Sequence, residues 1–178
     1  MREAFVLVGL ALLAGCASSP PIRFYTLNAV AREARPAGAS QPIRVTRVKL
    51  PGEIDRLELV QRVDANRVRL AEQDRWAAPL EELITRTLST DLQAAATSGD
   101  TPALLSVDIE ELIADAKCVV TLRAAWELKT SAAAGQTTHG YESIQVPAPA
   151  ECNVGVLPGA MSQALAELGE RILRSVSR

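Results

Sequence analysis

Residues 105–110 read Leu-Ser-Val-Asp-Ile-Glu, and residues 120–129 read Val-Thr-Leu-Arg-Ala-Ala-Trp-Glu-Leu-Lys. In both stretches apolar residues alternate with polar or small ones, which is the period of a β-strand with one buried side. This pattern is typical of an antiparallel sheet that is covered on one face. Trp126 and Cys118 share the apolar parity of the second stretch, so we expect both side chains in the core. The adjacent acids Glu110 and Glu111 are expected on opposite sides of their strand.

Five further segments have strand composition. Residues 57–63 and 67–71 are separated by Asp-Ala-Asn, which is turn chemistry, so these two segments are predicted to form a hairpin. The other predicted strands are residues 23–27, 43–50 and 137–146.

Two segments have helical periodicity. The first begins at Pro79, because proline is tolerated at the first helical position, and its apolar residues recur on one face. The second covers residues 159–177 and has the same kind of apolar face. Residues 23–178 are therefore predicted to form one domain of the α+β class. Its expected architecture is a two-layer sandwich, with two main amphipathic helices on one face of a mainly antiparallel sheet.

The composition argues against several functional classes. The chain has 178 residues, 19 basic and 21 acidic side chains, a net charge of −2 and one histidine. The near-neutral charge gives no sign of a nucleic-acid partner. A single histidine rules out a site with several histidine ligands, and the sequence contains no glycine-rich phosphate loop. No acid–base constellation is visible. We therefore expect no catalytic residue, no metal site and no enzymatic activity.

The N-terminus looks like a bacterial lipoprotein signal. Residues 4–14 are uncharged and mostly apolar, and this run is too short for the roughly 20 residues that span a bilayer. It ends in Leu13-Ala14-Gly15-Cys16, which resembles a lipobox. Residues 1–15 are therefore predicted to be a removed signal peptide, and residues 16–22 a tether. Cys16 is the predicted lipid anchor and carries a diacylglycerol and an N-acyl chain, with no further cofactor. The alternatives are an ordinary signal peptide and a buried helix with an incidental cysteine.

The residue after the anchor bears on localisation. In Gram-negative lipoproteins an aspartate at this position favours retention in the inner membrane, whereas this chain has Ala17. The sequence therefore predicts the outer membrane, on its periplasmic face. In that oxidising compartment Cys118 and Cys152 are expected to form a disulfide that closes a loop of about 35 residues. The alternative is two separate buried thiols.

Four residues are candidate partner contacts. Trp76 precedes the proline-opened helix and is either a staple that packs the helix entrance or an exposed aromatic anchor for a partner. Arg62, Arg67 and Arg69 flank the predicted hairpin tip and could meet acidic partners or lipid headgroups. Their alternative role is to protect a solvated edge strand by charge.

A family resemblance covers nearly all of the chain after Cys16. The sequence resembles the ABC-type transport auxiliary lipoproteins, the PqiC group. The residues that carry it are 24–27 (Phe-Tyr-Thr-Leu), 48–51 (Val-Lys-Leu-Pro), 54–62, 66–68, Glu72, 74–80 (Asp-Arg-Trp-Ala-Ala-Pro-Leu) and, further along, Ile84, Arg86, Leu88, Asp91 and Leu92. The likeness weakens after residue 103. Cys118 and Cys152 lie outside it.

The resemblance implies a fold and a function. The implied fold is a sandwich similar to the TolB N-terminal domain. The implied role is that of an outer-membrane lipoprotein that docks an MCE-type (mammalian cell entry) ABC lipid-transport system and supports envelope integrity. Its implied partners are an MCE-domain periplasmic protein and the outer membrane, and assembly as a homo-oligomer is compatible with it. The alternatives are an adaptor of another envelope machine, such as lipopolysaccharide assembly or a Tol-type scaffold, and a small carrier that binds lipid itself.

Overall fold

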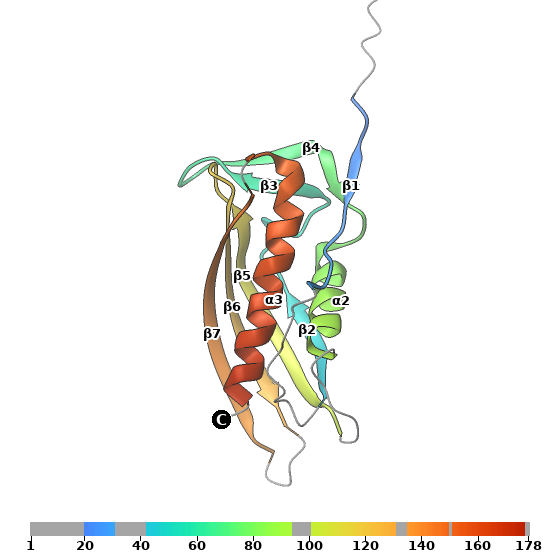
Figure 1. Cartoon of the computed structure of the whole chain (residues 1–178), viewed down its shortest axis with the longest axis vertical. Helices are drawn as coiled ribbons and strands as arrows, with labels where there is room; N and C mark the ends of the chain where they lie inside the picture. The colour runs from blue at the N-terminus through green and yellow to red at the C-terminus, as the bar shows by residue number, and fades with distance from the viewer. Residues whose placement is uncertain (1–19, 31–41, 94–100, 131–134, 150, 177–178) are drawn as a thin grey trace, which may run out of the picture.

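The computed structural model describes residues 20–30, 42–93, 101–130, 135–149 and 151–176, and the predicted signal peptide and Cys16 lie outside these ranges. The described part is an α+β fold (Figure 1). The elements are β1 (Arg23–Tyr25), β2 (Ile43–Lys49), β3 (Glu58–Arg62), β4 (Val68–Trp76), α2 (Leu80–Gln93), β5 (Ala103–Ala114), β6 (Val119–Lys129), β7 (Thr137–Pro147), the 3₁₀ turn η2 (Val154–Val156) and α3 (Leu157–Val176).

All seven strands join one sheet in the order β1-β4-β3-β5-β6-β7, with β2 also paired to β5. The long strand β5 has two neighbours on the same side. Its first half pairs with β2, from Ala103 to Asp108, and its last residue, Ala114, pairs with Gln61 of β3. The strand therefore runs from the β2 end of the molecule to the β3–β4 hairpin, which crosses the opposite end (Figure 1).

The predicted α+β sandwich is confirmed, and the sheet is mixed. The two longest pairings, β5–β6 and β6–β7, are antiparallel. The pairings β1–β4, β2–β5 and β3–β5 are parallel, and in each case the two strands are joined by the longer connection that parallel pairing requires.

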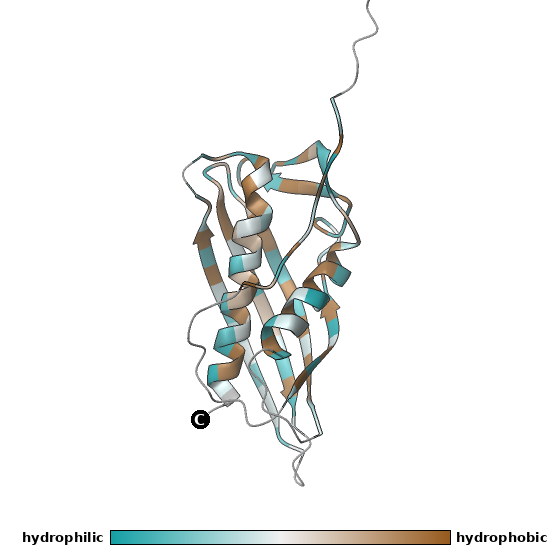
Figure 2. Cartoon of the chain, turned by 45° about the vertical axis from the view of Figure 1, so that its right-hand side comes forward, coloured by the Kyte–Doolittle hydropathy of each residue, from teal (hydrophilic) through white to brown (hydrophobic). Residues whose placement is uncertain are grey.

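Both helices cover the same face of the sheet. Helix α2 packs on β2, and α3 packs along β6 and β7, while the two helices also contact each other. Their apolar sides point toward the sheet and their polar sides toward solvent (Figure 2). The core lies between the helices and this face and consists mainly of leucine, isoleucine, valine and alanine. Trp126 is 4 % exposed, as its parity in the sequence predicts.

A β-bulge in β5 changes which side chains face the core. The register with β6 shifts between Ile109 and Glu111. Before the shift Ile109 faces the core, and after it Leu112 and Ala114 do so. The expectation that Glu110 and Glu111 lie on opposite sides is therefore wrong. The extra residue of a bulge breaks the two-residue period, and both acids contact side chains on the helix-free face.

The turn between β5 and β6 carries the predicted disulfide. The carboxylate of Asp115 accepts hydrogen bonds from the backbone N–H groups of Lys117 and Val119, both at 2.9 Å. Cys118 closes the turn with a φ of 60°, in the left-handed region. It is bonded to Cys152, with the two Cα atoms 5.5 Å apart. The bond ties this turn to the segment that leads into α3.

Candidate functional site

The strand β1 leads directly from the N-terminal segment and is fixed to β4 by a charged cluster. Arg23 donates from Nε and Nη2 to the two carboxylate oxygens of Asp74, at 2.7 and 2.8 Å. Tyr25 donates its hydroxyl to the same carboxylate at 2.8 Å. The hydrogen bond from Arg23 is the main reason that the pKa of Asp74 lies below its ordinary value. These charge-assisted hydrogen bonds therefore fix β1 to β4.

The hairpin between β3 and β4 turns as the sequence predicts. The carboxylate of Asp64 accepts hydrogen bonds from the backbone N–H groups of Asn66 and Arg67, both at 3.0 Å. The side chain of Arg67 adds an ion pair to Asp64 at 2.6 Å. The pKa of Asp64 lies below its ordinary value. The largest cause is the hydrogen bond from the backbone of Asn66, and the second is the hydrogen bond from the side chain of Arg67. These hydrogen bonds hold the hairpin turn closed, as is typical of a short carboxylate at this position.

Two arginines and one shared glutamate connect the hairpin to the main sheet. Glu111 is only 9 % exposed and accepts a hydrogen bond from Arg62 of β3. Its second carboxylate oxygen lies 3.3 Å from Nε of Arg123 on β6. One carboxylate on β5 therefore links the strands on either side of it.

The third predicted arginine is connected to the disulfide turn. Arg69 donates to the side-chain oxygen of Gln61, which is buried. The amide nitrogen of Gln61 donates to the carbonyl oxygen of Asp115 at 2.9 Å and lies 3.8 Å from Sγ of Cys118. Arg62, Arg67 and Arg69 therefore all have partners inside the protein, and their contact with an outside partner stays a prediction.

Trp76 does not have the exposed position that a partner contact requires. Its side chain is 3 % exposed and belongs to the core. Strand β4 extends through Trp76, whose backbone N–H donates to the carbonyl oxygen of Leu57 at 2.7 Å. The interpretation as an aromatic anchor is therefore wrong, and Trp76 closes the core at the entrance to α2. Cys16, the predicted lipid anchor, lies outside the described residues.

Exposed apolar side chains gather at the end of the molecule that this hairpin forms. Eight large hydrophobic side chains in the described ranges are exposed, and only Leu104 and Tyr141 lie on the long strands β5 and β7. The other six belong to the segment around β1 and to the β3–β4 hairpin: Ile22, Phe24, Leu57, Val63, Val68 and Leu70. Strand β1, the first element of the described chain, enters the fold at this same end (Figure 1). Sequence reasoning missed this gathering, because the residues are scattered in two separate segments.

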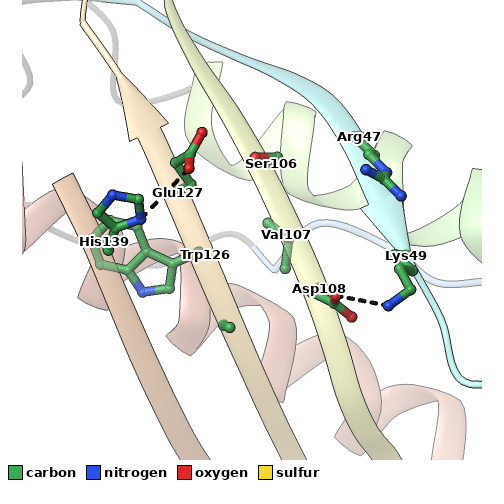
Figure 3. Close-up of a pocket in the computed structure, with 9 residues that line it drawn as sticks. Arg47, Lys49, Ser106, Val107, Asp108, Trp126, Glu127 and His139 are labelled. Atoms are coloured by element: carbon green, nitrogen blue, oxygen red, sulfur yellow. Dashed lines mark hydrogen bonds and ion pairs between the residues drawn. The ribbon is translucent and has the colours of Figure 1, made fainter. Parts of the chain in front are cut away.

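The helix-free face of the sheet has a shallow hollow of about 240 Å³ between β2 and β7 (Figure 3). Lys49 forms an ion pair with Asp108 at 3.0 Å, and Nδ1 of His139 lies 3.6 Å from Glu127. The pKa of Glu127 lies below its ordinary value, mainly because Lys129 donates a hydrogen bond to its carboxylate. In the described ranges no group of His, Cys, Asp and Glu residues is arranged to hold a metal ion.

The comparison with protein families decides the assignment. The model of the ABC-type transport auxiliary lipoprotein component matches residues 25–173, which includes both helices and almost the whole sheet. This chain belongs to that family. The resemblance in the sequence is therefore confirmed. The family is described as a transport auxiliary component.

Two solved structures have the same fold as this chain. An uncharacterized protein of 16 % identity superposes with a TM-score of 0.67, over 89 % of this chain and all of the other. A protein from Xanthomonas campestris, assigned to the family model DUF330, has 12 % identity and a TM-score of 0.68. That match covers 84 % of this chain and 92 % of the other. No functionally curated protein matches the sequence.

The family name describes a lipoprotein, which is held at a membrane by acyl chains. Within the part of the chain that the structure describes, no helix is both long and apolar enough to cross a bilayer.

Proposed function

We propose that this chain is anchored in the outer membrane through Cys16, faces the periplasm, and docks the periplasmic part of an MCE-type ABC lipid transporter there. The family match carries this proposal, because it begins at residue 25, nine residues after the lipobox cysteine. The matched fold is thus joined to the predicted anchor by a short segment. The proposed role needs binding surfaces and attachment, and it needs no chemistry.

The attachment has a clear physical basis. A single acyl chain binds a membrane only marginally, and two or more give stable anchoring. The family resemblance implies three chains on Cys16, one pair from diacylglycerol and one on the new N-terminus. The clamp between Arg23 and Asp74 then joins the anchored segment to the sheet.

The anchor is tested by mass spectrometry of the intact protein from purified membranes. The expected mature chain starts at Cys16, has 178 − 15 = 163 residues and carries three acyl chains. The matched control is Cys16→Ser, which cannot form the thioether and should lack the acyl mass and leave the outer-membrane fraction. Acyl-free wild-type protein with an intact N-terminus would overturn the proposed anchor.

The partner is tested by purifying the lipidated protein from membranes in mild detergent. We expect an MCE-domain protein in the complex, and light scattering on the same sample gives the number of copies of this chain. Recovery of a lipopolysaccharide-assembly or Tol-type complex without an MCE-domain protein would overturn the proposed transporter. Native mass spectrometry that repeatedly finds a non-covalent lipid on the isolated protein would favour a carrier over a docking subunit.

A further inference from the structure

We propose that the end of the fold formed by β1 and the β3–β4 hairpin rests on the phospholipid surface of the anchoring membrane. This inference rests on the proposed attachment through Cys16. It goes beyond that attachment because it assigns a second, non-covalent contact with the bilayer, made by side chains of the folded chain itself.

The apolar side chains at this end suit such a contact. Phe24 is 66 % exposed, next to Ile22, which is 47 % exposed. Val68 and Leu70 are 49 % and 39 % exposed and lie two residues apart on β4, so they share one side of that strand. Aromatic and aliphatic side chains of this kind partition into the boundary between headgroups and acyl chains.

The length of the tether brings the bilayer to this end. Cys16 and Arg23 are seven residues apart, and seven residues span at most about 25 Å. Strand β5 has 12 residues, about 40 Å at the rise of a strand, and it runs from the opposite end of the molecule to the hairpin. The anchored chain therefore keeps β1 close to the membrane. The start of β5, where Leu104 lies, is about a full strand length further away.

A charged group in the hairpin turn complements the apolar side chains. Arg67 is exposed and forms its ion pair with Asp64 through Nε. Its terminal N–H groups have no partner among the described residues and can donate to lipid phosphate oxygens. Val63 and Val68 flank this turn and are both exposed. Apolar side chains beside an arginine are the composition of a surface that lies in the headgroup layer.

A phospholipid surface is the occupant that the geometry favours over a protein. The six exposed side chains come from the segment around β1 and from the hairpin, and they mark the end of the molecule at which β1 enters the fold (Figure 1). A bilayer within about 25 Å of β1 meets this end before any other part of the fold.

Tryptophan quenching in vesicles tests the contact. Full-length lipidated protein is reconstituted in phosphatidylcholine–phosphatidylglycerol vesicles that contain brominated lipid. The two native tryptophans are 3 % and 4 % exposed, so they give a constant background. Phe24→Trp and Leu70→Trp place probes at the proposed contact. The matched control is Leu104→Trp, whose side chain is 42 % exposed at the opposite end.

We expect brominated lipid to quench about half of the added emission at positions 24 and 70, and to leave the probe at position 104 unchanged. Equal quenching at all three positions, or none at 24 and 70, would overturn the proposal. Flotation of the vesicles tests the attachment through Cys16 separately, because protein that lacks this attachment does not float with the vesicles. Shielding of the probe at position 24 that rises with protein concentration in detergent would show that a second copy covers this end, which also contradicts the proposal.

Discussion

Arg23 binds Asp74 through two parallel hydrogen bonds across 51 residues of sequence, at 2.7 and 2.8 Å. The arginine side chain is largely exposed, whereas the carboxylate is almost fully buried. The pair lies where β1 enters the fold, and it fixes this short strand to the sheet. Three residues of strand pairing alone would hold that strand weakly.

Asp74→Asn should lower the free energy of unfolding at pH 7 by about 1–2 kcal/mol, because the amide cannot accept both bonds from Arg23. The pKa of Asp74 is lowered in the folded protein, so its contribution is complete above the unfolded pKa of about 3.9 and is lost as the pH falls through the lower folded value. The difference between wild type and variant should therefore shrink below about pH 4. Urea unfolding at several pH values measures both effects.

The matched control for this variant is Asp108→Asn. Asp108 also pairs with a cation, Lys49, but both side chains are about half exposed. Its effect on the free energy of unfolding should stay below about 0.5 kcal/mol. Equal losses in the two variants would show that burial of Asp74 contributes nothing.

Removal of the disulfide by Cys118→Ala with Cys152→Ala should cost about 2–4 kcal/mol, because the open chain gains the freedom of a loop that spans 34 residues of sequence. Denaturant unfolding with and without a reducing agent measures the effect. The wild type should lose stability under reduction, and the double variant should not respond. Alkylation of unreduced mature protein at either cysteine would contradict the bond.

Gly140→Ala should destabilise the protein by about 1–3 kcal/mol. A Cβ at this position would lie 2.2 Å from an indole carbon of Trp126, which is in the core. Gly52→Ala is the matched control, since a Cβ there meets nothing within 4 Å, and its effect should be about 0.5 kcal/mol or less. Thermal unfolding compares the two.

The same clash predicts a coupling. Trp126→Phe removes the part of the ring that Gly140→Ala would touch, so the double variant should lose less stability than the sum of the two single ones. Additive losses would show that the indole is not the obstacle.

Glu111→Gln should cost about 1–2 kcal/mol, because Arg62 and Arg123 lose the carboxylate that they share. Glu110→Gln is the neighbouring control. Glu110 is exposed and accepts one hydrogen bond, from Tyr141 at 3.0 Å, so its loss should be smaller. Chemical denaturation of both variants checks this order. A larger loss at Glu110 would contradict the bracing role of Glu111.

The sequence predicted the sheet strands and both helices because these depend on local periodicity. The alternation at 105–110 and 120–129 follows from one buried face, and the turn at Asp64 follows from the bonding capacity of a short carboxylate. The end of β4 was placed too early, at residue 71. Its last residues pair in parallel with β1, and a partner that is distant in sequence leaves no local signal.

The candidate site was predictable only in part. The hairpin arginines were found, but their partners Glu111 and Gln61 belong to strands whose register the sequence does not specify. For Trp76 the sequence allowed a core staple or an exposed anchor. The local pattern is the same in both cases, and only the packing of β4 against the core decides between them.

The sequence by itself determined the fold class and the family resemblance and predicted the lipobox, because each is encoded in the order of neighbouring residues. The tertiary structure alone decided the bulge that brings Glu110 and Glu111 to one face, the clamp between Arg23 and Asp74, and the gathering of exposed apolar side chains around β1 and the β3–β4 hairpin. These features arise between segments far apart in the chain. They depend on strand order and register, which are set by the burial of the whole core.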